Sequence, residues 1–282
     1  MARLSEADHK FFDEQGYLVV RGLIPKAMCD ALVDGMHDFV GGDDRSLWYK
    51  PPFKDWGGLE MYQHPAMWAI RQYPPMYEVF SELLGGRKLW VSLDRCSYKL
   101  PNRPGDAKYA HEGFTHWDVD IRKVAADGHD GGVQGFVALS DVGEDGGGFQ
   151  CVPGIHRRLA AFIKKQREDF NGQDGNFEGE SIKQIPVKAG DVIIWKTSLA
   201  HGNAENKKDR ARIGFYVLMC RITDELRETR DRRIKQFVER VGLTMGASGE
   251  GDDRGWERKR MLPVELTELG KRLLGMEDWP ED

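Results

Sequence analysis

The sequence predicts a mainly β protein with flanking helices, built on an antiparallel sandwich or barrel. Four segments are rich in the β-branched and aromatic residues that strands favour, and turns containing Gly, Asp and Asn separate them. Consecutive strands without helical patterns between them favour antiparallel pairing. The segments are residues 88–100, 133–142, 181–195 and 211–220.

A mostly helical N-terminal region is expected over residues 1–87. Ser5 is a good N-cap and Gly16 a good stop for a first helix, and "YLVVRGL" follows as a strand. Pro25 opens a second helix, whose apolar side chains recur at helical spacing. Further helices are expected near residues 65–84.

Residues 43–64 are loop-like but carry more aromatic surface than a solvated linker would keep, so we expect this segment to pack over a pocket. Glycine- and aspartate-rich loops at 126–132 and 171–180 are expected to be mobile. The aromatic residues of the first segment are Trp48, Tyr49, Phe53, Trp56 and Tyr62.

We expect the chain to form a single domain, with a β core over residues 88–222 and a helical extension over 223–282. Helical patterns cover about 224–241 and 263–274, and the acidic, glycine-rich "GASGEGDDRG" separates them.

Composition fits a folded globular protein. Of the 282 residues, 40% are hydrophobic and 10% aromatic, enough for a substantial core. The 41 basic and 46 acidic residues give a net charge of -5, which argues against nucleic acid or an anionic membrane as a partner. The oligomeric state stays open.

Cysteine usage points to a reducing compartment. Cys29, Cys96, Cys151 and Cys220 are widely spaced and form no CxxC pair. The N-terminus has no apolar signal-peptide core, and no apolar run approaches the roughly 20 residues that span a bilayer. We therefore expect a cytoplasmic protein.

The stretch "GFTHWDVDIRK" alternates like a strand and holds a histidine and an aspartate two positions apart. Residues two apart on a strand project to the same face, so His116 and Asp118 could present an imidazole and a carboxylate side by side. This pair alone is a weak signal, because a polar strand edge without a metal gives the same pattern.

A third ligand is available farther along. His201 lies in a polar loop after an apolar strand, and two histidines with one carboxylate form the facial triad of non-haem Fe(II) oxygenases. Arg212 follows eleven residues later at the start of another strand. Its planar guanidinium could hold one end of a dicarboxylate such as 2-oxoglutarate. Arg210 shares strand parity with Arg212 and is the alternative.

With these motifs in view, the chain resembles the phytanoyl-CoA dioxygenase family of Fe(II)/2-oxoglutarate-dependent oxygenases, which includes ectoine hydroxylases. The resemblance extends over about residues 11–220, in the family's order and spacing. The matching pieces are "FFDEQGYLVVRGLIP", "HWD" at 116–118, "GGGFQCVPGIHR" at 146–157, "AGDVIIW" at 189–195 and "HGNAEN" from 201.

The resemblance implies a double-stranded β-helix, that is, a jelly-roll or cupin-like core. It also implies that Fe(II) is the metal and that 2-oxoglutarate and O2 are cosubstrates, so that a C–H bond of a small molecule is oxidised, most often hydroxylated, with release of succinate and CO2. The implied iron ligands are His116, Asp118 and His201, and the implied 2-oxoglutarate contacts are Arg212, Asn203 and Lys99.

Asn203 departs from the family pattern, which often has a small hydroxyl residue there. A further departure is the absence of an aromatic residue shortly after the HxD motif, where Asp120 and Arg122 stand. The carboxylate of Asp118 argues against the halogenase variant, which keeps that position small. No clustered basic patch suits the phosphates of CoA, so we expect a secondary metabolite, an amino-acid derivative or another modest-sized molecule as substrate.

Two other functions remain open at this stage. A zinc hydrolase could use the same three ligands and an activated water, with His111, Glu112 or Asp120 as general base. A non-catalytic jelly-roll binding protein would need neither Arg212 nor an open coordination face.

Other conspicuous residues have simpler interpretations. His156 follows a Pro-Gly turn and is expected to hydrogen-bond backbone. Trp117 and Trp195 are expected in the core. The "GGG" at 146–148 predicts a tight turn, because a phosphate-binding loop would continue into Lys-Ser/Thr and a helix.

Overall fold

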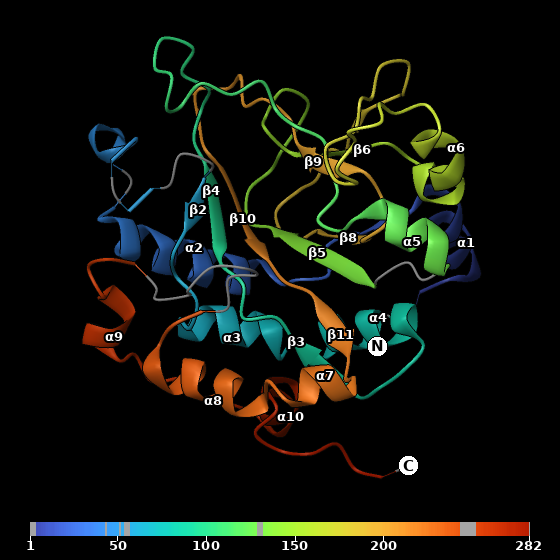
Figure 1. Ribbon diagram of the computed structural model, residues 1–282. Helices are drawn as coiled ribbons and strands as arrows, with labels where there is room; N and C mark the ends of the chain where they lie inside the picture. Colours follow the sequence, from blue (N-terminus) through green and yellow to red (C-terminus); the bar gives the residue numbers. More distant parts are fainter. Residues whose placement is uncertain are drawn as a thin grey trace.

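The computed structural model describes residues 4–42, 44–50, 52–53, 57–128, 132–242 and 252–281. Three expectations fall partly outside this set: Trp56, residues 129–131 of one loop, and residues 246–251 of the glycine-rich stretch. Within it, a large sheet crosses the middle of the molecule, with helices below and a smaller sheet above (Figure 1).

The two facing sheets form the jelly-roll core, so the mainly β prediction is confirmed. All pairings in both sheets are antiparallel. The larger sheet has the order β1 (Tyr17–Val20), β8 (Val192–Lys196), β5 (Val133–Ala138), β10 (Arg212–Tyr216), β4 (Cys96–Lys99) and β2 (Gly58–Leu59). The smaller sheet has the order β7 (Lys183–Gln184), β6 (Phe149–Cys151) and β9 (His201–Asn203).

Side-chain alternation gives the larger sheet two different faces. On β8, Val192 and Ile194 pack into the core beneath the sheet, whereas Ile193 and Trp195 join the second core on the side of the smaller sheet. Because residues two apart share a face, Arg212 on β10 lies on the second side, opposite the buried Phe215. The first face serves packing, and the second is available for chemistry.

Helices cover the first face of the sheet (Figure 1). The predicted N-terminal helix is confirmed: Ser5 forms a capping box with Asp8, and Gly16 ends the helix in the left-handed conformation. The helices of this region are α1 (Glu6–Gln15), α2 (Lys26–Val40), α3 (Pro65–Arg71) and α4 (Pro74–Leu84), with a 3-10 turn, η1 (Arg45–Leu47).

Three predicted strands are interrupted, and one is wrong. The segment 181–195 divides into β7 and β8, which lie in different sheets. The segment 88–100 divides into β3 (Leu89–Val91) and β4, and the segment 211–220 divides into β10 and β11 (Met219–Arg221). β3 and β11 pair with each other apart from the larger sheet.

The run 113–123 makes only isolated bridges at Gly113 and His116, and then turns into α5 (Ile121–Asp127). Asp120 ends the extended backbone because its side chain accepts the Arg122 N–H and so caps this helix. Further elements were not predicted, among them the 3-10 turn η2 (Ile155–Arg158), α6 (Leu159–Ile163) and the strands β6 and β9. His201, which was expected in a polar loop, is the first residue of β9.

The described aromatic residues of segment 43–64 stabilise the fold instead of lining the large cavity. Phe53 packs against Tyr98 in the core, and Tyr62 is fully buried. Tyr49 packs on Tyr109 of a neighbouring loop. The expectation that these side chains would cover a pocket is therefore wrong for the part of the segment that the structure describes.

The C-terminal helices are α7 (Asp224–Arg227), α8 (Arg230–Glu239), α9 (Trp256–Arg260) and α10 (Glu268–Leu274). Most of them form the lowest layer in Figure 1, and α9 lies at the left, level with α3. None of the helices in the described part of the chain combines the length and apolarity that a bilayer crossing requires.

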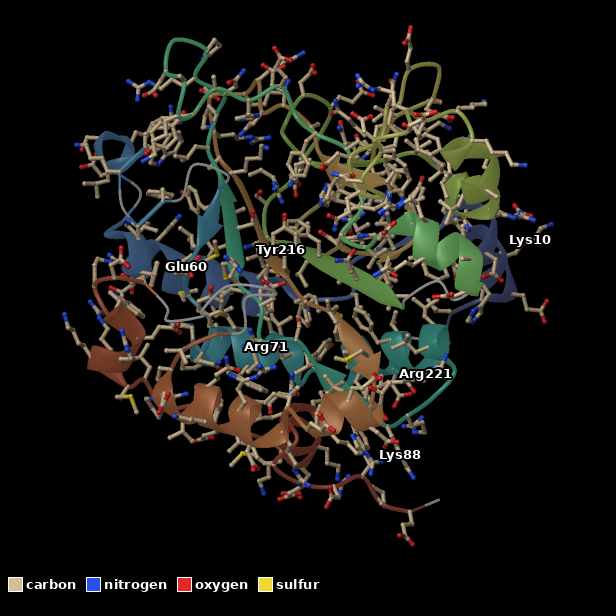
Figure 2. The ribbon with its side chains drawn as sticks, viewed as in Figure 1. Lys10, Glu60, Arg71, Lys88, Tyr216 and Arg221 are labelled. Carbon is tan, nitrogen blue, oxygen red and sulfur yellow. The ribbon has the colours of Figure 1, made fainter. Side chains whose placement is uncertain are left out.

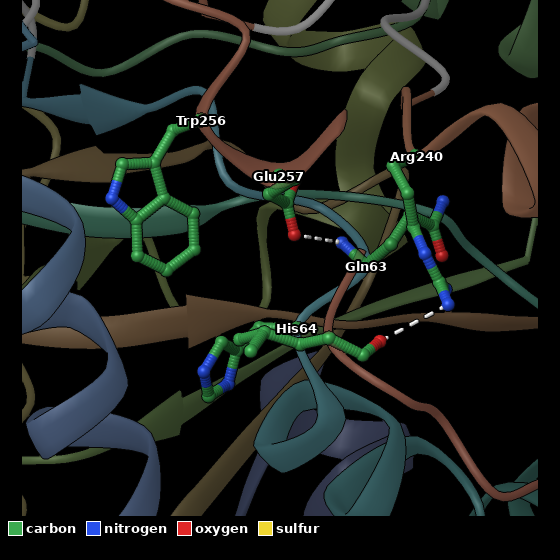
Figure 3. A pocket seen from close by; sticks show the side chains of 6 residues that line it. Gln63, His64, Arg240, Trp256 and Glu257 are labelled. Carbon is green, nitrogen blue, oxygen red and sulfur yellow. Dashed lines mark hydrogen bonds between the residues drawn. The ribbon is translucent and has the colours of Figure 1, made fainter. Parts of the chain in front are cut away.

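Glu257 of α9 anchors this layer to the chain before α3. Its carboxylate accepts the backbone N–H groups of Tyr62 at 2.7 Å and Gln63 at 2.8 Å. Arg240 and Trp256 line the same small cavity, and Arg240 donates to the carbonyl of Leu262 at 3.1 Å (Figure 3). Burial raises the pKa of Glu257 to about 7.

We predict that Glu257 makes stability fall as pH rises. The native carboxyl binds its proton more tightly than the unfolded one, so native stability declines between the ordinary pKa of 4.5 and about 7. Relative to Glu257→Gln, which cannot titrate, the wild type should lose up to roughly 3 kcal/mol over this interval. Urea unfolding of both proteins at several pH values measures this, and a pH-independent difference would contradict it.

Candidate active site

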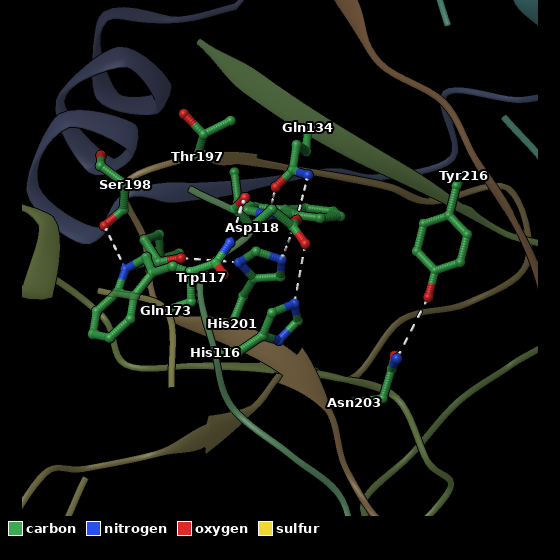
Figure 4. A network of polar contacts seen from close by, with 12 residues as sticks. His116, Trp117, Asp118, Gln134, Gln173, Thr197, Ser198, His201, Asn203 and Tyr216 are labelled. Atoms are coloured by element: carbon green, nitrogen blue, oxygen red, sulfur yellow. Dashed lines mark hydrogen bonds and ion pairs between the residues drawn. The ribbon is translucent and has the colours of Figure 1, made fainter. Parts of the chain in front are cut away.

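A cavity of about 430 Å³ lies between the second face of the larger sheet and the smaller sheet. Its lining includes Gln134 of β5, Trp195 of β8 and Tyr216 of β10, together with residues of β9. The volume lies within the roughly 300–1,000 Å³ typical of small-molecule sites. The sequence-predicted histidines and aspartate line one wall of this cavity (Figure 4).

Backbone pairing brings His116 and His201 together. The N–H of His116 donates to the carbonyl of His201 at 2.8 Å, and the reverse bond measures 3.0 Å. The Asp118 carboxylate lies between the two rings, 3.1 Å from Nε2 of His116 and 3.3 Å from Nε2 of His201. The candidate ligand atoms of all three residues lie within 4.8 Å of one another.

Neighbouring groups orient these side chains. The carbonyl of Leu199 lies 2.9 Å from His201 Nδ1 and can accept its proton, which orients Nε2 toward Asp118 and the cavity. Gln134 Nε2 donates to Asp118 Oδ2 at 2.6 Å, and Gln134 Oε1 accepts the indole N–H of Trp195 at 2.9 Å. Gln134 of β5 thus fixes the position of the Asp118 carboxylate.

The donor set fits a divalent metal. Burial opposes ionisation of Asp118, but hydrogen bonds from His116, His201 and Gln134 outweigh it and hold the pKa of this carboxyl below its ordinary value. One ionised carboxylate and two imidazoles on one side of an open cavity match the facial triad in residue type and arrangement.

Two buried cations lie at one end of the same sheet face. Arg212 and Lys99 are opposite each other on β10 and β4, and only 3% and 5% exposed. Neither has a carboxylate partner in the described parts of the chain. Arg212 donates to Asn203 Oδ1 at 3.0 Å, and its guanidinium lies 4.8 Å from the ring centre of Phe136.

This end of the sheet face can therefore bind an anion. Burial, reinforced by the Arg212 charge, lowers the pKa of Lys99 to about 7. A bound carboxylate would offset the cost of burying both cations without counter-ions. The competing clamp residue, Arg210, is exposed at the surface.

The general bases considered for a hydrolase are badly placed. Asp120 caps α5 and pairs with Arg122 at 2.7 Å, and these hydrogen bonds lower its pKa to about 2. Glu112 is exposed, and neither it nor His111 is among the residues that line the cavity in the described part of the chain.

Three expectations about supporting residues are confirmed. His156 Nε2 lies 2.9 Å from the carbonyl of Asp13, consistent with a turn residue that bonds backbone. Trp117 is fully buried, and its indole N–H donates to the carbonyl of Ser198 at 3.0 Å. Trp195 belongs to the core but also supports Gln134, a role that sequence reasoning missed.

Comparisons with known proteins agree with this picture. The family model "Phytanoyl-CoA dioxygenase (PhyH)" matches residues 12–214. A Dictyostelium discoideum protein named "Putative phytanoyl-CoA dioxygenase" is 22% identical over 82% of this chain and 80% of its own length.

Two solved structures show the same fold. The Escherichia coli hypothetical protein JW0805 aligns with a TM-score of 0.71 at 15% identity, over 97% of this chain and 82% of that one. The epimerase SnoN, solved with Fe3+, α-ketoglutarate and nogalamycin RO, aligns with a TM-score of 0.56 at 14% identity, over 88% and 93%.

We predict that Gln134 positions Asp118. Gln134→Leu removes the 2.6 Å hydrogen bond to the carboxylate, and loss of such an outer contact typically weakens metal binding by roughly 10- to 100-fold. Calorimetric titration with Co(II) measures this directly. Gln173→Leu is the matched control, because Gln173 contacts only the backbone carbonyl of Asp118. Equal metal affinity in wild type and Gln134→Leu would contradict the assignment.

Proposed function

The chain belongs to the phytanoyl-CoA dioxygenase family, and we propose that it uses Fe(II), 2-oxoglutarate and O2 to oxidise an unactivated C–H bond of a small organic molecule. Hydroxylation, with release of succinate and CO2, is the proposed outcome. The observation that carries the proposal is the convergence of His116, Asp118 and His201 beside two buried cations without carboxylate partners in the described residues.

Each residue has a distinct part in the proposal. His116, Asp118 and His201 hold the metal from one side, so its other side faces the cavity. When bound, Fe(II) supplies the centre at which O2 is reduced while 2-oxoglutarate is oxidised.

The far carboxylate of 2-oxoglutarate is bound by the Arg212 guanidinium and the Lys99 ammonium. Asn203 orients the guanidinium, because its Oδ1 accepts from Arg212 Nη2 at 3.0 Å. Phe136 and Tyr216 line the cavity next to this end and keep water from the buried charges. That SnoN was solved with Fe3+ and α-ketoglutarate in a similar fold supports this arrangement.

The competing functions explain less of the site. A zinc hydrolase needs a general base near the metal. Of the three candidates, Asp120 caps α5 and pairs with Arg122, Glu112 is exposed, and His111 does not line the cavity. A non-catalytic binding protein would not need two buried cations placed to hold a cosubstrate.

Broader features of the protein are proposed on the same basis. We propose that residues 1–282 act as one domain whose partner is a small molecule. A cytoplasmic location remains a prediction, supported by four cysteines that are all unpaired.

We predict a weak visible charge-transfer band when Fe(II) and 2-oxoglutarate are added without O2. His116→Ala removes one of the three converging ligand atoms and should abolish the band and 2-oxoglutarate-dependent succinate formation. His9→Ala, which changes a histidine of α1 that does not line the cavity, is the control. Unchanged succinate formation in His116→Ala would count decisively against the proposal.

We predict that Arg212 and not Arg210 determines affinity for 2-oxoglutarate. Arg212→Gln removes the charge-assisted bond to the far carboxylate and should raise the dissociation constant roughly 30-fold or more. Arg210→Gln makes the same chemical change at an exposed position and should leave it unaltered. Anaerobic titration of the charge-transfer band distinguishes them, and equal losses in both variants would refute the assignment.

A further inference from the structure

A second charged group lies on the same sheet face as Lys99 and Arg212, but at its other end. Along β4, Arg95 is four residues before Lys99, and its carbonyl accepts the Tyr216 N–H of β10 at 3.1 Å. Since a strand rises about 3.3 Å per residue, the two ends are separated by roughly 13 Å. Asp94 and Arg95 both line the 430 Å³ cavity.

The carboxylates of Glu60 and Asp94 meet the guanidinium of Arg95 at this end, and the charge of the buried Arg71 also acts on Asp94. Arg95 Nη1 donates to Glu60 Oε1 at 2.9 Å, and Arg95 Nε lies 3.5 Å from Asp94 Oδ1. Glu60 is also stabilised by the Tyr62 hydroxyl, which donates to it at 2.5 Å. One guanidinium thus faces two carboxylates, and Glu60 has the better contacts. Glu60 and Tyr216 are labelled in Figure 2.

Asp94 is the carboxylate that remains available. Its Oδ1 accepts the Arg95 N–H at 2.7 Å, whereas Oδ2 makes no hydrogen bond in the portion of the chain that is described. The side chain is 34% exposed although the strand that follows it is buried, and Asp94 is a lining residue of the cavity.

The backbone holds Asp94 rigidly in place. Arg71, which is fully buried, donates to the Asp94 carbonyl at 2.7 Å and to the Tyr62 carbonyl at 2.6 Å. Ser92 N–H donates to the carbonyl of Leu218 at 2.8 Å, which joins the segment to the cavity wall. A preformed carboxylate of this kind binds a cation without an ordering cost.

We propose that Asp94 recognises a protonated amino group of the substrate, so that the enzyme acts on a small amine or amino-acid-like molecule. The inference rests on the proposed function, because it assigns 2-oxoglutarate to the Lys99–Arg212 end and the substrate to the other. Val217 and Leu218 line the cavity beside Asp94 and contact the carbon skeleton. An ammonium group can donate to the Asp94 Oδ2 atom, because Arg95 contacts only Oδ1.

The test compares three six-carbon probes that differ only in the head group: hexylammonium, 1-hexanol and hexanoate. Each is titrated calorimetrically into the protein loaded with Fe(II) and 2-oxoglutarate without O2. We expect hexylammonium to bind roughly tenfold or more tightly than the other two, the effect of one charge-assisted bond. Asp94→Asn should remove this preference and Asp94→Glu should retain part of it.

Asp209→Asn is the matched control, since it makes the same change at an exposed position and should keep the preference. The charge-transfer band of each variant shows separately whether 2-oxoglutarate still binds. A missing band in the wild type would overturn the proposed function itself. A normal band with no preference for hexylammonium, no binding of it, or an undiminished preference in Asp94→Asn would overturn only the role of Asp94.

Discussion

The site depends on one pair of backbone hydrogen bonds, those between His116 and His201. They join an extended segment to the edge of β9, at 2.8 and 3.0 Å, next to a second bridge between Gly113 and Ala204. With the two backbones fixed at this spacing, both imidazoles project to the same side, and Asp118, two residues farther on, lies between them. Residues far apart in the sequence thereby form one set of candidate metal ligands. Contacts between the side chains alone would not fix their relative positions.

The larger sheet separates structural from chemical tasks by alternation. One face buries aliphatic residues against α2, α3 and α4. The other face carries Arg212, Gln134 and Tyr216, which line the cavity, and Lys99, which lies opposite Arg212. Burying two cations without carboxylate partners costs stability, and a fold keeps such groups where a ligand compensates them. The stability lost by burying Lys99 and Arg212 is thus linked to their proposed role in binding 2-oxoglutarate.

Sequence patterns predicted the residues whose chemistry is distinctive. His116, Asp118, His201 and Arg212 stand out because their types and order suit a metal and a dicarboxylate, and the structure brings the first three together. Gln134 gives no such signal, because glutamine is common on partly exposed strands. Its role follows only from its hydrogen bond to Asp118 in the structure.

The errors have local physical causes. The strand predicted through the HxD motif ends because Asp120 caps a helix, which alternation of polar and apolar residues does not reveal. The segment 88–100 reads as one strand, but its interruption at residues 92–95 places Asp94 in the cavity wall. The aromatic residues of segment 43–64 were expected to cover a pocket, because apolar residue types alone do not distinguish a core position from a cavity lining.

X-ray absorption of the protein loaded anaerobically with Fe(II) and 2-oxoglutarate tests the central claim most directly. The account predicts one iron per chain with two imidazoles in its inner shell and oxygen atoms at the remaining positions, and loss of one imidazole in His201→Ala. Iron with no ordered imidazole shell, or a spectrum unchanged by that substitution, would contradict it.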